Sequence, residues 1–263
     1  MGALIFNGVS SRDLGIEVEH LLDYPVPERD TSKVHIPGRN GDLIVDHGSF
    51  KNIKRSYQVS FPFNRGDQSL IMSKIANWLY SSVGYARLED TYDPECYRLA
   101  SYSKATTIQN LFNQAGRFTI EFDCKPQRFL KLGERMIHSK EKRLTLSNPT
   151  SFEAYPLIVM MGSGSGTMIV KRKSVGISNL DKPIFFDTEL QEAFGFYDLT
   201  NNPDEVEKRI SSKVRSSRTL VNRNKDIELD NFTDFPPLVP GLNYIRLSGQ
   251  FTDIFVVPRW WTI

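Results

Sequence analysis

The sequence has few of the residues that bind metals or form disulfide bonds. It contains two cysteines, Cys96 and Cys124, and four histidines among 263 residues. The cysteines are too far apart for a zinc-binding pair and too few for a disulfide framework, so we expect two reduced thiols. No i, i+4 pair of histidines occurs, and no histidine adjoins a cysteine pair. The histidines are His20, His35, His47 and His138. We therefore predict no metal site and no cofactor.

Long apolar runs and an excess of one charge are also missing. No stretch approaches the ~20 apolar residues that span a bilayer, and the N-terminus lacks the basic and apolar regions of a secretory signal. The formal net charge of +2 excludes a grossly basic nucleic-acid binder. We expect a protein made in a reducing cytoplasm and not inserted in a membrane.

Common catalytic motifs are absent. The glycine run from 162 to 166 lacks the Lys-Ser/Thr of a phosphate loop and predicts a β-turn, and no G-x-S-x-G elbow occurs. Four acids lie around Tyr92 and Pro94, and acids held ~5–10 Å apart cleave glycosidic bonds. Because these acids lie in a proline-containing loop, we interpret them instead as a solvated edge. They are Glu89, Asp90, Asp93 and Glu95. With no nucleophile, base and oxyanion site together, we predict that the chain is not an enzyme.

What the sequence does contain is β patterning, beginning with a hairpin signal. The segment from Pro37 to Gly41 reads Pro-Gly-Arg-Asn-Gly, in which proline fixes one angle and Asn-Gly accepts positive φ. Residues 25–32 before it indicate a loop. After a short apolar flank, Tyr57, Val59, Phe61 and Phe63 alternate with polar residues, as in a half-buried strand. We predict a protruding hairpin over about 33–57, too exposed to be stable alone and suited to a neighbouring chain.

The rest of the first domain, residues 1–134, predicts a sheet or sandwich with one packed α-helix. Asp67 is placed to cap a helix over about 67–83, which Gly84 ends. Its apolar stripe has helical spacing and comprises Leu70, Ile71, Ile75, Trp78 and Leu79. A later strand buries alternate residues from Phe118 to Cys124, and Pro126 is expected to close it. The charged, aperiodic segment 131–142 marks the domain boundary.

Residues 135–263 predict a β-sandwich of short strands with regular turns. Strands are expected at 156–161, 168–170, 174–177 and 184–187, and two more close the chain, at 243–247 and 252–257, joined by Ser248-Gly249. Trp260 and Trp261 follow. Because adjacent strand residues face opposite sides, at most one of them joins a sugar-stacking platform, and we interpret the pair as core anchors.

A basic insertion, about 198–235, interrupts this pattern. Asn202, Pro203 and the acids after them form a helix start, so we expect a short helix inside a long loop. Five basic residues follow as candidate partner contacts, either for phosphate or for an acidic neighbour; the alternative is a solvated loop. They are Lys208, Arg209, Lys213, Arg215 and Arg218.

Six short motifs occur in a characteristic order along nearly the whole chain. They are Phe6-Asn7-Gly8; Ile36-Pro37-Gly38-Arg39-Asn40-Gly41; Asp46 with Phe50; Asn148-Pro149; Pro156 with Gly162; and Leu238-Val239-Pro240-Gly241-Leu242-Asn243. In this order and spacing the chain resembles the distal tail protein (Dit) family of long-tailed, non-contractile bacteriophages.

The resemblance implies a structural virion protein without enzymatic activity. Family members form a hexameric ring at the tail tip, with a first domain that builds the ring and a peripheral galectin-like β-sandwich. One ring face continues the tail tube and the other meets the tail-tip protein, or tail-associated lysin, while DNA passes through the channel without specific binding. The hairpin reaches along a neighbouring subunit as a belt. The implied interface residues are Ile36, Pro37, Gly38, Arg39, Asn40, Gly41, Asp42 and Leu43.

Other interpretations stay open at this point. A monomeric β-sandwich that binds carbohydrate through exposed aromatic residues is the main alternative, and a glycan-cleaving enzyme using two of the loop acids is another. A prophage remnant or tailocin would use the same protein. The chain has no room for a separate carbohydrate-binding module, and the basic insertion is expected to face a neighbouring baseplate protein, such as a receptor-binding protein, or the cell surface.

Overall fold

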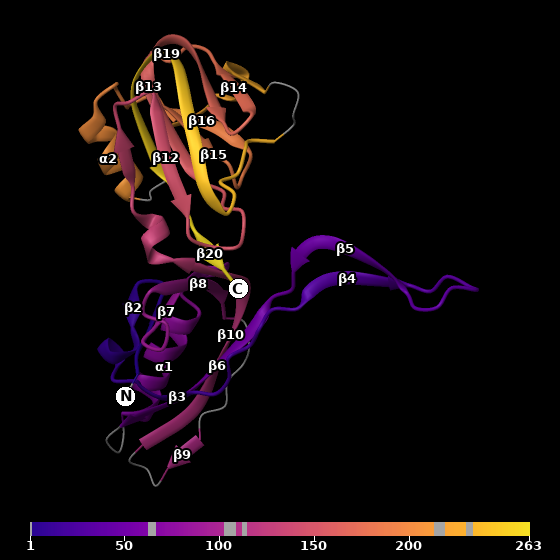
Figure 1. The fold of residues 1–263 in the computed structure, drawn as a ribbon. Coiled ribbons are helices and arrows are strands. Elements are labelled where there is room, and N and C mark those ends of the chain that lie inside the picture. Colours follow the sequence, from indigo (N-terminus) through magenta and orange to yellow (C-terminus); the bar gives the residue numbers. More distant parts are fainter. Residues whose placement is uncertain (1, 63–66, 103–108, 112–114, 213–218, 230–233) are drawn as a thin grey trace. The chain divides into compact units, whose positions relative to one another are not determined.

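The computed structural model describes residues 2–62, 67–102, 109–111, 115–212, 219–229 and 234–263. The chain divides into two compact units, one of Met1–Phe129 with Ile263 and one of Leu130–Thr262. Both are mainly β, as Figure 1 shows. None of the described helices is both long and apolar enough to cross a membrane. The described residues also contain no group of three or more His, Cys, Asp or Glu side chains that could hold a metal ion.

The first unit is an antiparallel sheet with one helix and a separate hairpin. The strands β1 to β10 and the helices are β1 (Leu4–Phe6), β2 (Val9–Ser10), the 3-10 helix η1 (Ser11–Leu14), β3 (Glu17–Leu21), β4 (Arg29–Val34), β5 (Leu43–Phe50), β6 (Ile53–Pro62), α1 (Gln68–Leu79), β7 (Ala86–Asp90), β8 (Cys96–Ser101), β9 (Gln109–Leu111) and β10 (Ala115–Leu130). The sheet runs in the order β2-β1-β7-β8-β10-β6-β3, and β9 also pairs with β10. Strands β4 and β5 form a sheet of their own.

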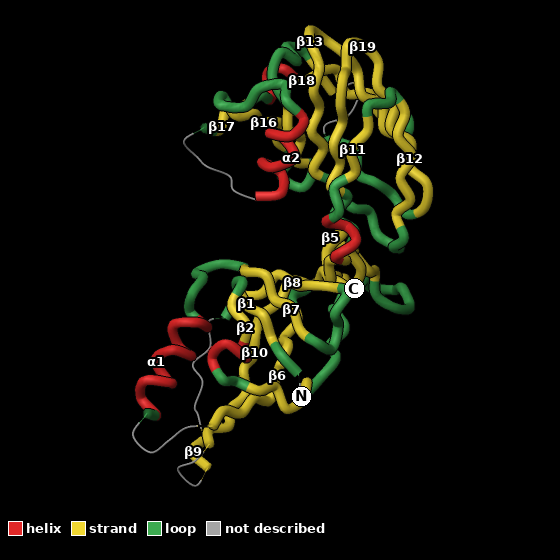
Figure 2. Tube along the Cα trace, turned by 90° about the vertical axis from the view of Figure 1, so that its left-hand side faces the viewer, coloured by secondary structure: helices red, strands yellow, loops and turns green. Residues whose placement is uncertain are grey.

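Alternation along β6 and β10 builds the core of this unit, as the sequence predicts. Tyr57, Val59 and Phe61 are buried on β6, while Phe63 lies outside the described residues. On β10, every second residue from Phe118 to Cys124 is buried. Helix α1 adds three residues to the same cluster, Ile75, Trp78 and Leu79, and lies beside the sheet in Figure 2. The indole of Trp78 donates to the Phe6 carbonyl at 3.2 Å, which fixes α1 to β1.

Three local predictions for this unit are wrong. Strand β10 continues past Pro126 to Leu130; its ladder with β6 has already ended at Cys124, so the missing N–H of Pro126 breaks no hydrogen bond to β6. Helix α1 ends at Leu79, with Tyr80 as its C-cap rather than Gly84. Leu70 is exposed, since the buried stripe of α1 begins one residue later.

Both thiols are free and buried. Burial raises the pKa of Cys124 to about 12 and also raises the pKa of Cys96. At pH 8 we therefore expect Cys124 to react with Ellman's reagent about 1,000-fold more slowly in the folded chain than after unfolding, because its thiolate is scarce. Thiols that stay protonated in the fold but ionise when unfolded also make stability fall as pH rises above about 9. Fast labelling of two thiols without denaturant would contradict this packing.

The second unit is built on two long strands. Its elements are η2 (Lys131–Glu134), β11 (Ile137–Ser139), β12 (Arg143–Asn148), β13 (Leu157–Val170), β14 (Lys173–Ile177), β15 (Ile184–Asp187), β16 (Glu192–Phe196), α2 (Pro203–Ser212), β17 (Leu220–Asn222), η3 (Asn224–Asp226), β18 (Ile227–Leu229), β19 (Gly241–Val257) and β20 (Trp261–Thr262). β13 and β19 pair along nearly their full length.

These two strands are shared by both layers of a β-sandwich. The first half of β13 pairs with β15, and its second half pairs with β14. Likewise, β12 pairs with the first half of β19 and β11 with its end. Side chains from both halves of both strands meet in one core; examples are Ile158, Met168, Ile245 and Val256. Val159 and Met161 face the other way, into a second cluster that includes Val206 of α2. The mainly β sandwich expected from sequence is confirmed.

Two predicted turns are instead bends inside continuous strands. The glycine run lies within β13, and Ser248-Gly249 lies within β19. The register of the two strands shifts between Met161 and Gly162 and again between Ser163 and Gly166. The two backbones come so close that a Cβ on Gly162 would lie 2.4 Å from the Gln250 carbonyl oxygen. Glycine is required here by the close approach of a partner strand, which local sequence does not reveal.

Gly249 gives a direct test of this bend. Its φ is +101°, and an added Cβ would lie 2.5 Å from the Ser165 carbonyl oxygen. We expect Gly249→Ala to destabilise the second unit by about 2–5 kcal/mol, from backbone strain together with overpacking. Urea unfolding measures the change. Gly176→Ala is the matched control, since its Cβ would make only a 3.4 Å contact and its φ is ordinary. Equal stability of the two variants would contradict the close approach.

Candidate assembly interface

The β4–β5 hairpin is the most exposed β structure in the first unit. Within the described residues, the outer edges of β4 and β5 pair with no further strand. Almost all of their residues are exposed or half-buried. The hairpin therefore presents unpaired backbone N–H and C=O groups on two edges, the arrangement that accepts a strand from another chain.

The two faces of the hairpin differ in polarity. Val34 pairs with Leu43 and Ser32 pairs with Val45, so these four side chains share one face. We call Val34, Leu43 and Val45 the apolar face; they are 46%, 41% and 40% exposed. The opposite face carries Lys33 and Ile44 as partners, and Ile44 is 63% exposed. Aliphatic side chains gathered on a thin, solvated ribbon are characteristic of a surface that a partner covers.

The hairpin tip differs in two respects from the sequence prediction. The strands end at Val34 and Leu43, so residues 35–42 form a longer loop than a tight turn. Gly38 and Gly41 both have φ of +79°, whereas Asn40 does not have positive φ. The Arg39 N–H donates to the Ile36 carbonyl at 3.1 Å, which closes a turn around Pro37. The glycines provide the left-handed backbone positions of the loop, as the sequence predicts.

The base of the hairpin is fixed by an ion pair and a bulge. Arg29 donates to Asp46 at 2.7 Å, and its guanidinium lies 5.0 Å from the centre of the Phe50 ring. The Gly48 N–H and the Arg29 guanidinium lower the pKa of Asp46. Because β4 begins at Arg29, the prediction of a loop over 25–32 is wrong for its last residues. The hairpin comprises residues 29–50, and β6 is a separate strand of the main sheet.

Asp90, one of the four candidate acids, is not on a solvated edge. Its side chain is 6% exposed at the end of β7. One carboxylate oxygen accepts from Arg55 at 2.8 Å and from the Tyr57 hydroxyl at 2.6 Å, and the other accepts the N–H groups of Tyr92 and Asp93 at 2.9 Å. Burial raises the pKa of Tyr57, and the Asp90 charge raises it further. Both oxygens of this carboxylate are fully occupied by hydrogen bonds. The carboxylate therefore links β6 to β7 and has no lone pair left for a substrate.

The remaining acids also lie apart from any shared reaction centre. Glu89 pairs with Arg87 on the same strand, Asp93 lies 3.4 Å from Arg128, and Glu95 is exposed in the loop before β8. The sequence placed these residues in one loop, but β7 already includes Glu89 and Asp90, and Asp90 is drawn into the core by a long-range partner.

The basic insertion is part of the second unit's sheets rather than one long loop. Helix α2 begins at Pro203, as predicted, but β17 pairs with β16 and β18 pairs with β14. Arg209 donates to Asp198 at 2.7 Å and lies over the Phe196 ring, so it supports the fold. Lys208 is exposed. The other three candidates lie outside the described residues; they are Lys213, Arg215 and Arg218.

Comparison with solved structures gives the same fold over the full chain. The crystal structure of the SPP1 Dit protein, described as a paradigm of the hub adsorption apparatus in phages that infect Gram-positive bacteria, matches with a TM-score of 0.67 and 14% identity over 97% of this chain and 98% of that one. The chain has the Dit fold. No family model matches the sequence, and no curated protein matches it either.

Two further structures extend the Dit comparison. They are the baseplate of phage P2 in its activated conformation, with Ca and with Sr. Their matching chains have TM-scores of 0.53 and 0.52 and 9% identity, over 97% of this chain in both cases and over 97% and 96% of those chains. The likeness spans the whole length of the neighbours, so it includes both units of the Dit fold.

The aromatic pair of this Dit-like chain does not form a sugar platform. Trp260 is 4% exposed and belongs to the sandwich core. Trp261 stacks on Phe152 with ring centres 4.5 Å apart and donates its N–H to the Glu153 carbonyl. Both residues therefore anchor the chain end, as predicted from strand geometry.

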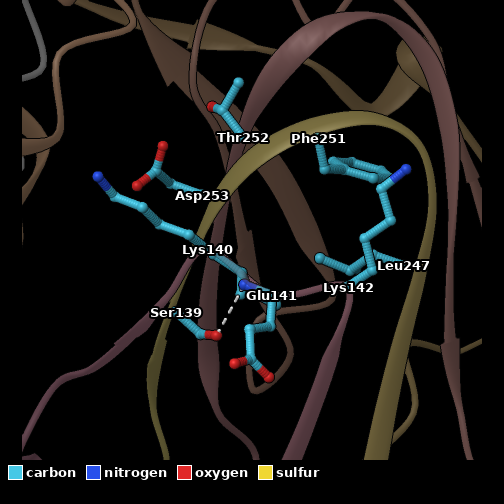
Figure 3. A pocket seen from close by; sticks show the side chains of 9 residues that line it. Ser139, Lys140, Glu141, Lys142, Leu247, Phe251, Thr252 and Asp253 are labelled. Atoms are coloured by element: carbon cyan, nitrogen blue, oxygen red, sulfur yellow. Dashed lines mark hydrogen bonds between the residues drawn. The ribbon is translucent and has the colours of Figure 1, made fainter.

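A hollow at the start of β12 is closed by the chain's own side chains. Figure 3 shows Ser139, Glu141, Lys142, Phe251 and Asp253 around it. Its interior has no room for a water molecule. The Lys142 ammonium donates to the Gly249 carbonyl at 3.0 Å, and the Ser139 hydroxyl accepts from the Glu141 N–H. This hollow is a packed junction and not a ligand site.

Proposed function

We propose that this chain is a structural hub at the distal end of a siphophage tail. Six copies form a ring around a channel for DNA, one face of the ring continues the tail tube, and the other binds the tail-tip protein. The observation that carries the proposal is the end-to-end match to the SPP1 Dit hub protein at a TM-score of 0.67. The protein acts in the virion, after synthesis in the host cytoplasm, and its role is assembly rather than catalysis.

The hairpin supplies the physical basis for a ring. A ring requires a heterologous interface, in which one surface of each subunit meets a different surface of the next. The β4–β5 edges and the apolar face are unlike the remainder of the first unit, so they suit one half of such an interface. The proposed interface residues at the tip are Ile36, Pro37, Gly38, Arg39, Asn40, Gly41, Asp42 and Leu43. Backbone hydrogen bonds and covered aliphatic side chains then join neighbouring copies.

The second unit carries the outward contacts in this proposal. Lys208 on α2 is exposed, whereas the neighbouring Arg209 is held by its ion pair with Asp198. We assign it, together with the basic residues after it, to a neighbouring baseplate protein or to the cell surface. The two phage P2 structures in which similar chains occur are structures of a baseplate, which supports contacts with other baseplate components.

A photo-crosslinking experiment tests the belt contact. Benzoyl-phenylalanine in place of Ile44 puts the reactive group on a strongly exposed hairpin position. We expect illumination of the purified chain to give covalent dimers and a ladder of higher oligomers. The same group at Val83, an exposed residue of the same unit outside the hairpin, is the control and should give monomer only. Monomer from both variants would contradict the proposed belt.

A further inference from the structure

A cavity of about 230 Å³ in the first unit is lined by three arginines. They are Arg55 from β6, Arg98 from β8 and Arg128 from β10. The segment before β4 forms another part of the lining, with Tyr24, Pro25 and Val26. Three guanidinium groups around one cavity repel one another, so this arrangement needs compensating negative charge.

Two of the three cations have a partner on this chain. Arg55 is paired with the buried Asp90 at 2.8 Å. Arg128 lies 3.4 Å from Asp93, although its Nε is buried without a hydrogen-bond partner. Neither of these two carboxylates pairs with the third arginine. Ile263 also lines the cavity, but among the described residues no ion pair joins it to that arginine.

Arg98 is that third cation. It is 7% exposed, and within the described residues its only hydrogen bond is a long one, 3.5 Å, to the Pro126 carbonyl. No described carboxylate lies within ion-pair distance of it. Burial lowers the pKa of Arg98, and the charges of Arg55 and Arg128 lower it further. A buried charge that lacks both a partner and a full set of hydrogen bonds is strongly disfavoured.

The charge balance and the surroundings specify the missing group. The Arg98 guanidinium has no described ion-pair partner, and its planar fork matches a carboxylate through two parallel hydrogen bonds. A polyanion such as nucleic acid is disfavoured, because Asp93 lines the cavity and Asp23 directly precedes its rim. The rim itself is apolar and open: Tyr24 is 71% exposed and Val26 is 80% exposed. Tyrosine and arginine are both enriched in the hot spots of protein interfaces.

We propose that Arg98 and Arg128 bind the side-chain carboxylate of an Asp or Glu from a protein partner, and that Tyr24 and Val26 pack against the residues flanking that acid. This site is separate from the hairpin tip. It does not depend on the hub function, because its ligand is defined by the cavity alone.

Calorimetric titration of the full chain with a short peptide tests the proposal. The probe is acetyl-Leu-Glu-Leu-amide, and the matched control is the same peptide with glutamine. We expect saturable binding of the glutamate peptide and at least tenfold weaker binding of the glutamine peptide. Arg98→Gln should weaken binding of the glutamate peptide at least tenfold, and Tyr24→Ala should weaken it at least threefold. Arg117→Gln, which alters an exposed arginine of the same unit, should leave affinity unchanged.

The outcomes separate the alternatives. If Arg98→Gln does not fold, Arg128→Gln tests the site through the same titration. This change is milder, because the Arg128 side chain is 37% exposed. Equal binding of both peptides, or unchanged affinity in either arginine variant that folds, overturns the site. Tighter binding of inorganic phosphate than of the glutamate peptide overturns the assignment to a carboxylate. A hairpin variant that no longer forms rings should still bind the peptide, so failure of the hub proposal is distinguishable from failure of this one.

Discussion

Replacing Gly38 and Gly41 together with valine leaves the chain folded but monomeric. Both glycines have φ of +79°, a left-handed conformation that costs a residue with a Cβ roughly 1–2 kcal/mol and a β-branched residue more. The tip loop is exposed and contributes nothing to the core, so it adopts a different shape instead of unfolding the unit. The apolar face and the strand edges are then presented in the wrong geometry to the neighbouring subunit. Light scattering after size-exclusion chromatography measures the loss.

The control for this variant lies on the same unit. A Cβ on Gly84 would also meet nothing within 4 Å, but its φ is ordinary. Gly84→Val should therefore form the same oligomer as the unaltered chain, and thermal unfolding of all three proteins should agree within a few degrees. Intact rings from the double glycine variant would refute the role of the hairpin tip. A large fall in its unfolding temperature would instead show that the tip supports folding.

Replacing Asp90 with alanine destabilises the first unit by about 3–5 kcal/mol. The change leaves the Arg55 guanidinium, whose side chain is 3% exposed, without its counter-charge. It also removes the acceptor of the Tyr57 hydroxyl and of two backbone N–H groups. Because β6 and β7 lose their polar link, the effect should appear in the unfolding transition of the first unit. Urea unfolding followed by tryptophan fluorescence measures it, since Trp78 packs in the same core.

An exposed ion pair in the same unit provides the comparison. Arg117 lies 2.9 Å from Glu19, with side chains 48% and 22% exposed. Glu19→Gln should cost less than about 1 kcal/mol, because water screens that pair. A double-mutant cycle with Arg55→Met and Asp90→Ala should show that the double variant costs less than the sum of the two single changes. Additive costs, or equal effects of the Asp90 and Glu19 changes, would contradict the buried network.

Sequence periodicity predicted the elements whose burial is set locally. Alternation identified the core face of β6 and of β10, since a half-buried strand shows its pattern in its own residues. The Asn202-Pro203 start of α2 and the left-handed glycines of the hairpin tip were likewise predictable, because capping and positive φ are local requirements. These signals, together with the order of the motifs, were sufficient for the Dit fold.

The parts that sequence missed depend on distant partners. Gly162 and Gly249 look like turn residues. Each is needed because a Cβ at its position would lie only 2.4 Å or 2.5 Å, respectively, from a carbonyl oxygen of the partner strand. Asp90 looks like a loop acid, but Arg55, 35 residues away, draws it into the core. Arg209 looks like a free cation until Asp198 is folded against it. The cavity arginines come from three separate strands, so no local spacing could have brought them together.

The mass of the purified chain in solution tests the central claim most directly. Size-exclusion chromatography with light scattering should give about six times the chain mass of 30.1 kDa, and negative-stain images of that peak should show rings with a central channel. A single species of one chain mass at every protein concentration, with no rings in the images, would contradict the hub.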